Sequence, residues 1–89
     1  MIQLVDAQAM AKAHPKTFEA PDANELEAVK VGDSVKVCIN NKERLWVEVT
    51  EINGGQLKGR IDNCPVFIDE VDFGDTINFR KENIYDIFN

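Results

Sequence analysis

The sequence predicts an α+β fold, with two short helices followed by about five short strands of a strongly bent antiparallel sheet. Residues 1–30 are rich in alanine and show no strand alternation, whereas residues 31–89 alternate between apolar and polar positions. A Gly-Asp pair opens an alternating segment twice, at residues 31–37 and 73–79. The Asn-Gly-Gly run at residues 53–55 is the strongest hairpin signal.

Both helices are predicted from capping residues. Asp6 is a candidate N-cap for a helix over residues 7–13, and Pro15 ends it because the residue before proline avoids the α region. The acidic residues at the two ends of residues 22–25 have the spacing of a capping box, which predicts a second helix over residues 23–29.

Three strands of a meander follow from local signals. Apolar residues occupy every second position in residues 34–39 and again in 44–52, and the turn at 53–55 joins the latter to 56–62. Gly59 in mid-strand predicts a bend or bulge of the kind that barrels use at their corners. In each Gly-Asp turn we expect glycine to take a positive φ and aspartate to bond its own backbone.

The remaining strands are shorter. Residues 66–68 form a brief apolar run, interpreted as a short strand or an edge, and residues 76–79 and 84–88 complete the set. Short strands at this spacing predict a small SH3-like barrel on which the helices pack. The residues expected to form one core are Val35, Val37, Val47, Val49, Ile61, Ile77 and Phe79.

Length and charge narrow the function classes. Eighty-nine residues predict one domain, with the helical segment 1–30 packing on a barrel of residues 31–89. A net charge of −6 argues against nucleic acid and against an anionic membrane surface, and suits either solubility or a basic partner. With no signal-peptide pattern in residues 1–13, a cytoplasmic location is expected.

No catalytic residue, metal site or cofactor is predicted. Cys38, Cys64 and the single histidine, His14, lack zinc-ligand spacing, and the two thiols are interpreted as small apolar residues, with a disulfide as the alternative. The acidic residues are interpreted as a solvated face, and they are Glu43, Glu48, Glu51, Asp62, Asp69, Glu70, Asp72 and Asp75.

The candidate binding residues come from two segments. Strand alternation places Trp46 and Glu48 on the outer side of the sheet, where Trp46 is either covered by the N-terminal helices or serves as an aromatic anchor for a partner. Arg60, Asp62 and Asn63 form either a turn built by side-chain bonds to the backbone or a polar binding loop.

Four segments occur in an order that is typical of one protein family, namely residues 43–50, 59–65, 73–75 and 83–86. Over about residues 17 to 88 the chain resembles the YegJ-like group of small bacterial proteins, a domain of unknown function. The resemblance implies a compact α+β domain with a bent sheet, and it implies no established activity, cofactor or catalytic residue.

The leading hypothesis is therefore a non-enzymatic protein-interaction module, of which one form is an acidic immunity-type protein that binds a basic partner. The alternative is a nucleic-acid-binding barrel, which would require Lys36, Lys58 and Arg60 to cluster with exposed aromatic residues. An enzyme ranks third, because it would require a cleft with a perturbed carboxylate.

Overall fold

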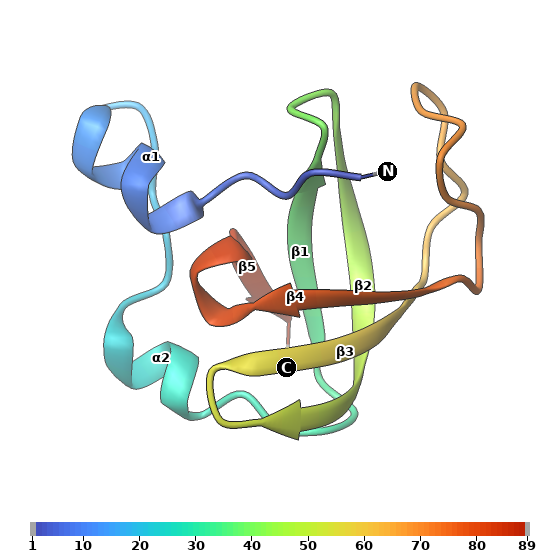
Figure 1. Ribbon diagram of the computed structural model, residues 1–89. Helices are drawn as coiled ribbons and strands as arrows, with labels where there is room; N and C mark the ends of the chain where they lie inside the picture. Colours follow the sequence, from blue (N-terminus) through green and yellow to red (C-terminus); the bar gives the residue numbers. More distant parts are fainter. Residues whose placement is uncertain (1, 89) are drawn as a thin grey trace.

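Five antiparallel strands form one sheet in the order β4-β3-β2-β1-β5 in the computed structural model, which describes residues 2–88 (Figure 1). The helices and the antiparallel sheet confirm the α+β class. Within residues 2–88 no ladder joins β4 to β5, so the sheet is not closed into a barrel. The elements are α1 (Ala7–Ala13), α2 (Ala23–Glu27), β1 (Ser34–Ile39), β2 (Glu43–Asn53), β3 (Gln56–Ile61), β4 (Thr76–Arg80), the 3₁₀ helix η1 (Lys81–Asn83) and β5 (Asp86–Phe88).

The helix caps are those the sequence predicts. The Asp6 carboxylate accepts a hydrogen bond from the Ala9 amide at 3.0 Å. In α2 the capping box is complete, because the Asp22 carboxylate accepts from the Glu25 amide at 2.8 Å and the Glu25 carboxylate accepts from the Asp22 amide at 3.1 Å. The second helix ends at Glu27, two residues before the expected end.

The two Gly-Asp turns share one geometry, which confirms their interpretation. Gly32 and Gly74 have φ values of +98° and +89°. Asp33 accepts a side-chain hydrogen bond from the Lys30 amide at 3.0 Å, and its own amide donates to the Lys30 carbonyl. Asp75 makes the same pair of bonds with Asp72, the side-chain bond being 2.8 Å long.

The hairpin between β2 and β3 is also confirmed, with Gly54 and Gly55 as its turn residues. The register of this pair shifts between Val49 and Glu51, so β2 carries a bulge opposite Gly59. A Cβ atom at Gly59 would lie 2.7 Å from the Glu48 carbonyl oxygen, which explains why the position needs glycine.

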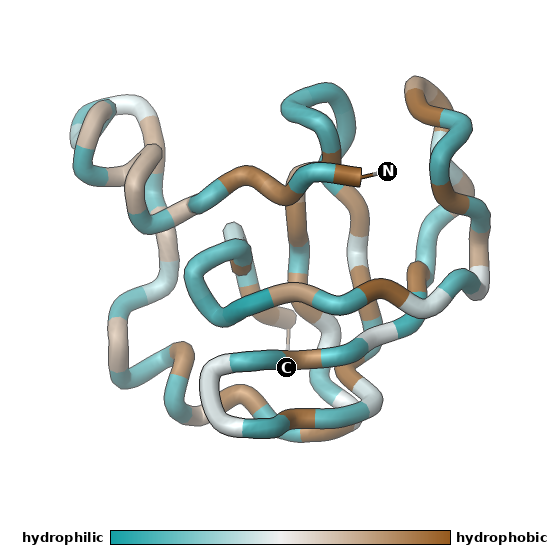
Figure 2. The backbone as a smooth tube through the Cα atoms, in the orientation of Figure 1, coloured by the Kyte–Doolittle hydropathy of each residue, from teal (hydrophilic) through white to brown (hydrophobic). Residues whose placement is uncertain are grey.

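The seven residues predicted to form the core are all buried. Leu26 and Val29, from α2 and the segment after it, belong to the same buried cluster. Figure 2 shows hydrophobic and hydrophilic segments alternating along the strands. One side of the sheet therefore faces the core, and the side chains between the core positions face outward.

The N-terminal segment contains a backbone pairing that the sequence did not suggest. Leu4 forms an isolated antiparallel bridge with Ile39, and the Val5 amide donates to the Cys38 carbonyl at 3.1 Å. Residues 2–5 thus extend the sheet beside the end of β1, although the first thirty residues show no strand alternation.

The apolar run at residues 66–68 is not a strand. It lies in the long loop between β3 and β4, where the amides of Val66 and Phe67 donate to the Glu43 carboxylate. Because these two amides donate to a side chain, they cannot donate to a neighbouring strand. The interpretation of residues 66–68 as a short strand or a sheet edge is therefore wrong.

Candidate functional site

The outer side of the sheet carries a group of stacked aromatic and basic side chains, which we call the aromatic face. Its members are Phe18, Lys36, Arg44, Trp46, Tyr85 and Phe88. Lys36 on β1 is paired directly with Trp46 on β2, and its Nζ lies 4.8 Å from the Trp46 ring centroid. Phe88 on β5 packs edge-on against the same ring, with centroids 6.2 Å apart.

A second stack repeats this arrangement beside the first. The Arg44 guanidinium carbon lies 4.8 Å from the centroid of the Tyr85 ring, and Phe18 packs edge-on against that ring at 4.8 Å. Arg44 precedes Trp46 by two positions on β2, so strand alternation places both on the outer side. Each stack therefore consists of a cation on an aromatic face and a phenylalanine at the edge.

The fold changes the titration of Tyr85. Partial burial raises the pKa of its phenol above 10.0, and the neighbouring Cys38 thiol raises it further, while the Arg44 guanidinium opposes both effects. Cys38 itself is buried and Cys64 is exposed, and both are free thiols. The Arg44 guanidinium thus lies over a partly buried phenol ring.

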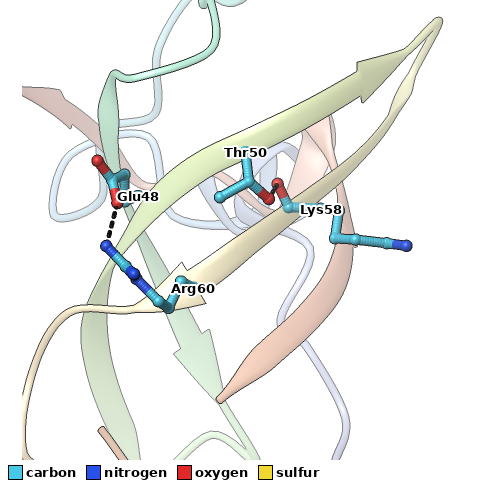
Figure 3. Close-up of polar contacts among 4 residues, drawn as sticks. All are labelled: Glu48, Thr50, Lys58 and Arg60. Carbon is cyan, nitrogen blue, oxygen red and sulfur yellow. Dashed lines mark hydrogen bonds and ion pairs between the residues drawn. The ribbon is translucent and has the colours of Figure 1, made fainter. Parts of the chain in front are cut away.

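An ion pair borders the aromatic face. Glu48 on β2 is paired across the sheet with Arg60 on β3, and their side chains meet at 2.7 Å (Figure 3). Beside them the Thr50 hydroxyl donates to the Lys58 carbonyl at 3.1 Å. Because both charged side chains are substantially exposed, the pair contributes little to stability, and its charges are accessible to a partner.

Asp62 and Asn63 approach Trp46 through its backbone. The Asp62 amide donates to the Trp46 carbonyl at 2.9 Å, and the Asn63 side-chain oxygen accepts from the Trp46 amide at 2.5 Å. The five predicted binding residues thus lie in one connected region, with Trp46 and Glu48 on β2, Arg60 opposite, and the other two immediately after β3. The role shown for Asn63 is to fix the loop to β2, as the turn interpretation expects.

The helix α2 does not pack on Trp46. The apolar residues Leu26 and Val29 belong to the buried core on the other side of the sheet, so the prediction that Trp46 is their packing surface is wrong. Trp46 is nevertheless partly buried, and the side chains that stack on its ring are Lys36 and Phe88.

Residues 62–75 form a second candidate surface, which we call the acidic loop. Val66 and Phe67 are 76% and 75% exposed within it. Glu43, at the start of β2, accepts hydrogen bonds of 2.7 to 3.0 Å from their two amides. Sequence reasoning assigned Glu43 to a solvated acidic face and missed this role, because nothing local links it to residues more than twenty positions later.

A cleft of about 310 Å³ lies beside the aromatic face. Its lining mixes both signs of charge, from Lys36, Arg44 and Asp86 among others. Among residues 2–88 no three histidine, cysteine or acidic side chains are placed to hold a metal ion. In the same part of the chain, no helix has both the length and the apolar composition needed to cross a membrane.

The chain was compared with known proteins. Residues 22–88 match the family described as "Uncharacterized protein conserved in bacteria (DUF2314)". Searches among curated proteins and among solved structures gave no significant match. The match agrees with the expected resemblance to an uncharacterised bacterial family, while the YegJ-like name stays a prediction. Because the match spans more than half of the sequence, the chain belongs to this family of uncharacterised proteins conserved in bacteria.

Proposed function

We propose that this protein is a non-enzymatic interaction module that binds another protein through its aromatic face. The observation that carries the proposal is the pair of adjacent stacks, Lys36–Trp46–Phe88 and Arg44–Tyr85–Phe18. Tryptophan, tyrosine and arginine are the residues most enriched among those that dominate binding energy at protein interfaces.

The stacks also reduce what binding would cost. Ordering a flexible side chain at an interface costs about 0.5–1.5 kcal/mol. Lys36 and Arg44 already rest on the rings of Trp46 and Tyr85, and neither forms an ion pair with another residue in 2–88. Their charges are thus positioned yet free to meet a partner's carboxylate or carbonyl groups.

The net charge of the whole chain favours a partner that is basic overall, whereas the two cations of the aromatic face would meet carboxylate or carbonyl groups on it. The net charge of −6 would accelerate association with a positively charged protein, as in an immunity-type protein that blocks a basic toxin. We also propose that the bent sheet is SH3-like, since the bulge in β2 bends it as a small barrel requires, although β4 and β5 are not paired.

Photocrosslinking at position 88 tests the proposal. Phe88 is 70% exposed at the border of the aromatic face, so a benzoylphenylalanine there should crosslink a protein in bacterial cells. The same group at Val31, which is 58% exposed outside the face, is the matched control.

The crosslinked protein is then purified and titrated with the wild type and Trp46→Ala. Loss of affinity by about tenfold or more, with an unchanged circular dichroism spectrum, is the expected result. Equal affinity for both chains, or a protein captured equally from position 31, would contradict the proposal.

One observation favours the second candidate, single-stranded nucleic acid. Lys36 lies on β1 and both Lys58 and Arg60 lie on β3, on the two sides of the strand that carries Trp46, so basic residues flank a stacked aromatic ring. Against it, the Arg60 charge is paired with Glu48 and the net charge is strongly negative. Fluorescence anisotropy with labelled oligothymidine distinguishes the two candidates. Micromolar, salt-sensitive binding at physiological salt would favour nucleic acid over a protein partner.

A further inference from the structure

We propose that the acidic loop is a second docking surface, which binds a basic, apolar segment of a protein partner with Val66 and Phe67 as its anchors. This inference rests on the proposed function and deepens it, because it names the chemistry of the partner and a contact outside the aromatic face.

The first argument is exposure at one place. Val66 and Phe67 are adjacent in sequence and about three-quarters exposed, and Phe73 in the same loop is 62% exposed. Figure 2 shows hydrophobic chain at the outer bend of the loop that runs between β3 and β4. Burying one such side chain in an interface removes apolar area from water, which favours binding.

The second argument is that the loop is held in place. Ile68 and Val71, next to the exposed residues, are 5% and 6% exposed and belong to the core. The Asn40 side-chain amide donates to the Glu70 carboxylate at 3.2 Å, which ties the loop to the β1–β2 turn. Together with the Glu43 carboxylate, these contacts fix both sides of the exposed segment, so its apolar side chains are presented without a large ordering cost.

The third argument is charge, which selects the occupant. The acidic residues of the loop are Asp62, Asp69, Glu70, Asp72 and Asp75. The sequence has no lysine or arginine between Ile61 and Phe79. Like charges make a second copy of this loop and an anionic lipid surface unfavourable occupants, whereas lysine or arginine beside an apolar residue would satisfy both features of the surface.

The probe is a synthetic amphipathic peptide of lysine and leucine, about 15 residues long, titrated into the intact ¹⁵N-labelled chain. We expect it to shift the amide resonances of residues 64–73, and to bind more weakly as salt screens the charges. A lysine–serine peptide and a glutamate–leucine peptide of equal length should leave these resonances unchanged.

Two variants make the test specific. Val66→Ser combined with Phe67→Ser should weaken the binding of the lysine–leucine peptide by about tenfold or more. Val31→Ser, which removes a 58% exposed apolar side chain outside the loop, should leave the affinity for this peptide unchanged. Because all three side chains are exposed, both variants should fold, and their spectra report this directly.

Several results would overturn the inference. Resonance shifts that are absent, or confined to the aromatic face, would show that the peptide does not bind the loop, and equal binding of the lysine–serine peptide would show that the apolar anchors are not used. Broadening of the loop resonances with protein concentration, in the absence of peptide, would indicate a second copy of the chain as the occupant. Sedimentation of the protein with phosphatidylglycerol vesicles would indicate a lipid surface. The protein crosslinked at position 88 separates this failure from that of the proposed function. If Trp46→Ala weakens the binding of this crosslinked protein, and the double variant Val66→Ser and Phe67→Ser leaves that binding unchanged, the inference fails while the proposed function stands.

Discussion

The aromatic face and the acidic loop both expose aromatic side chains, but different interactions hold them. Trp46, Lys36 and Arg44 stand on β1 and β2, where β-ladders fix the backbone and the outward direction follows from alternation. Phe67 stands on a segment without ladder bonds, held by a single carboxylate and two buried neighbours. The sheet is thus a shared platform, whereas the loop depends on a few individual contacts.

This difference has a consequence for mutation. Substitutions beneath the aromatic face should lower the stability of the whole molecule, because the core is continuous across β1 to β4. Substitutions at the loop's attachment points should loosen the loop and leave the sheet intact. Four changes of decreasing effect test this contrast.

The largest effect is expected at Leu45, which is 2% exposed on β2. Leu45→Ala removes buried area and leaves a cavity, so it should lower the free energy of unfolding by about 2–5 kcal/mol. Val66→Ala, in the exposed part of the loop, should change it by no more than about 0.5 kcal/mol. Urea denaturation measures both, and similar values for the two variants would break the comparison.

The next effect is expected at Gly59. An alanine Cβ there would clash with the Val47 side chain and lie 2.7 Å from the Glu48 carbonyl oxygen, so Gly59→Ala should cost about 1–3 kcal/mol. Gly55→Ala is the matched control, because no atom lies within 4 Å of its added Cβ. A Gly59→Ala chain as stable as the control would mean that β2 and β3 approach less closely here.

A smaller effect is expected at Glu43. Glu43→Gln removes the charge that accepts the amides of Val66 and Phe67, and should lower stability by about 1 kcal/mol. Amide exchange should accelerate at residues 66 and 67 and stay unchanged in β2 and β3. Glu51→Gln, an exposed acidic position on the same strand, is the control. Faster exchange throughout the sheet would show that the loop is not an independent part.

The smallest effect is a pH dependence at Tyr85. Its raised pKa means that the folded state resists forming the phenolate, so the contribution to stability is complete below pH 10.0 and is lost as pH rises through the folded pKa. Wild type should lose stability relative to Tyr85→Phe as the pH rises above 10.0. Absorbance at 295 nm follows Tyr85 alone, since it is the only tyrosine. Titration at or below pH 10 would contradict the burial of its ring.

Local chemistry predicted most of the sheet. Short-range interactions, within a few residues, determine the Gly-Asp turns, the helix caps at Asp6 and Asp22 and the Gly54-Gly55 hairpin. The alternation that places Trp46 on the outer side of the sheet is also a local pattern. The cross-strand ion pair between Glu48 and Arg60 depends in addition on the bulge between Val49 and Glu51, which shifts the hairpin register by one residue.

The loop and the termini could not be predicted in this way. The bonds from Val66 and Phe67 to Glu43 join residues 23 and 24 positions apart, and the pairing of Leu4 with Ile39 spans a larger distance. An apolar run such as residues 66–68 fits a strand by composition alone, and only the position of a distant carboxylate makes it a loop. The apolar face of α2 was likewise assigned to the wrong side of the sheet. Helical periodicity identifies which side of the helix is apolar, but it does not identify the surface on which that side packs.

The central claim is that the acidic loop, like the sheet, is ordered before any partner binds. Hydrogen exchange of the free protein tests it most directly, read at the amides of Val66, Phe67 and Asp72, which donate to Glu43 and Asp75 carboxylates. The account predicts that these three amides exchange at least about tenfold more slowly than unstructured chain, although their side chains are exposed. Exchange at the unstructured rate would show that the acidic loop is not held in place, and would contradict the claim.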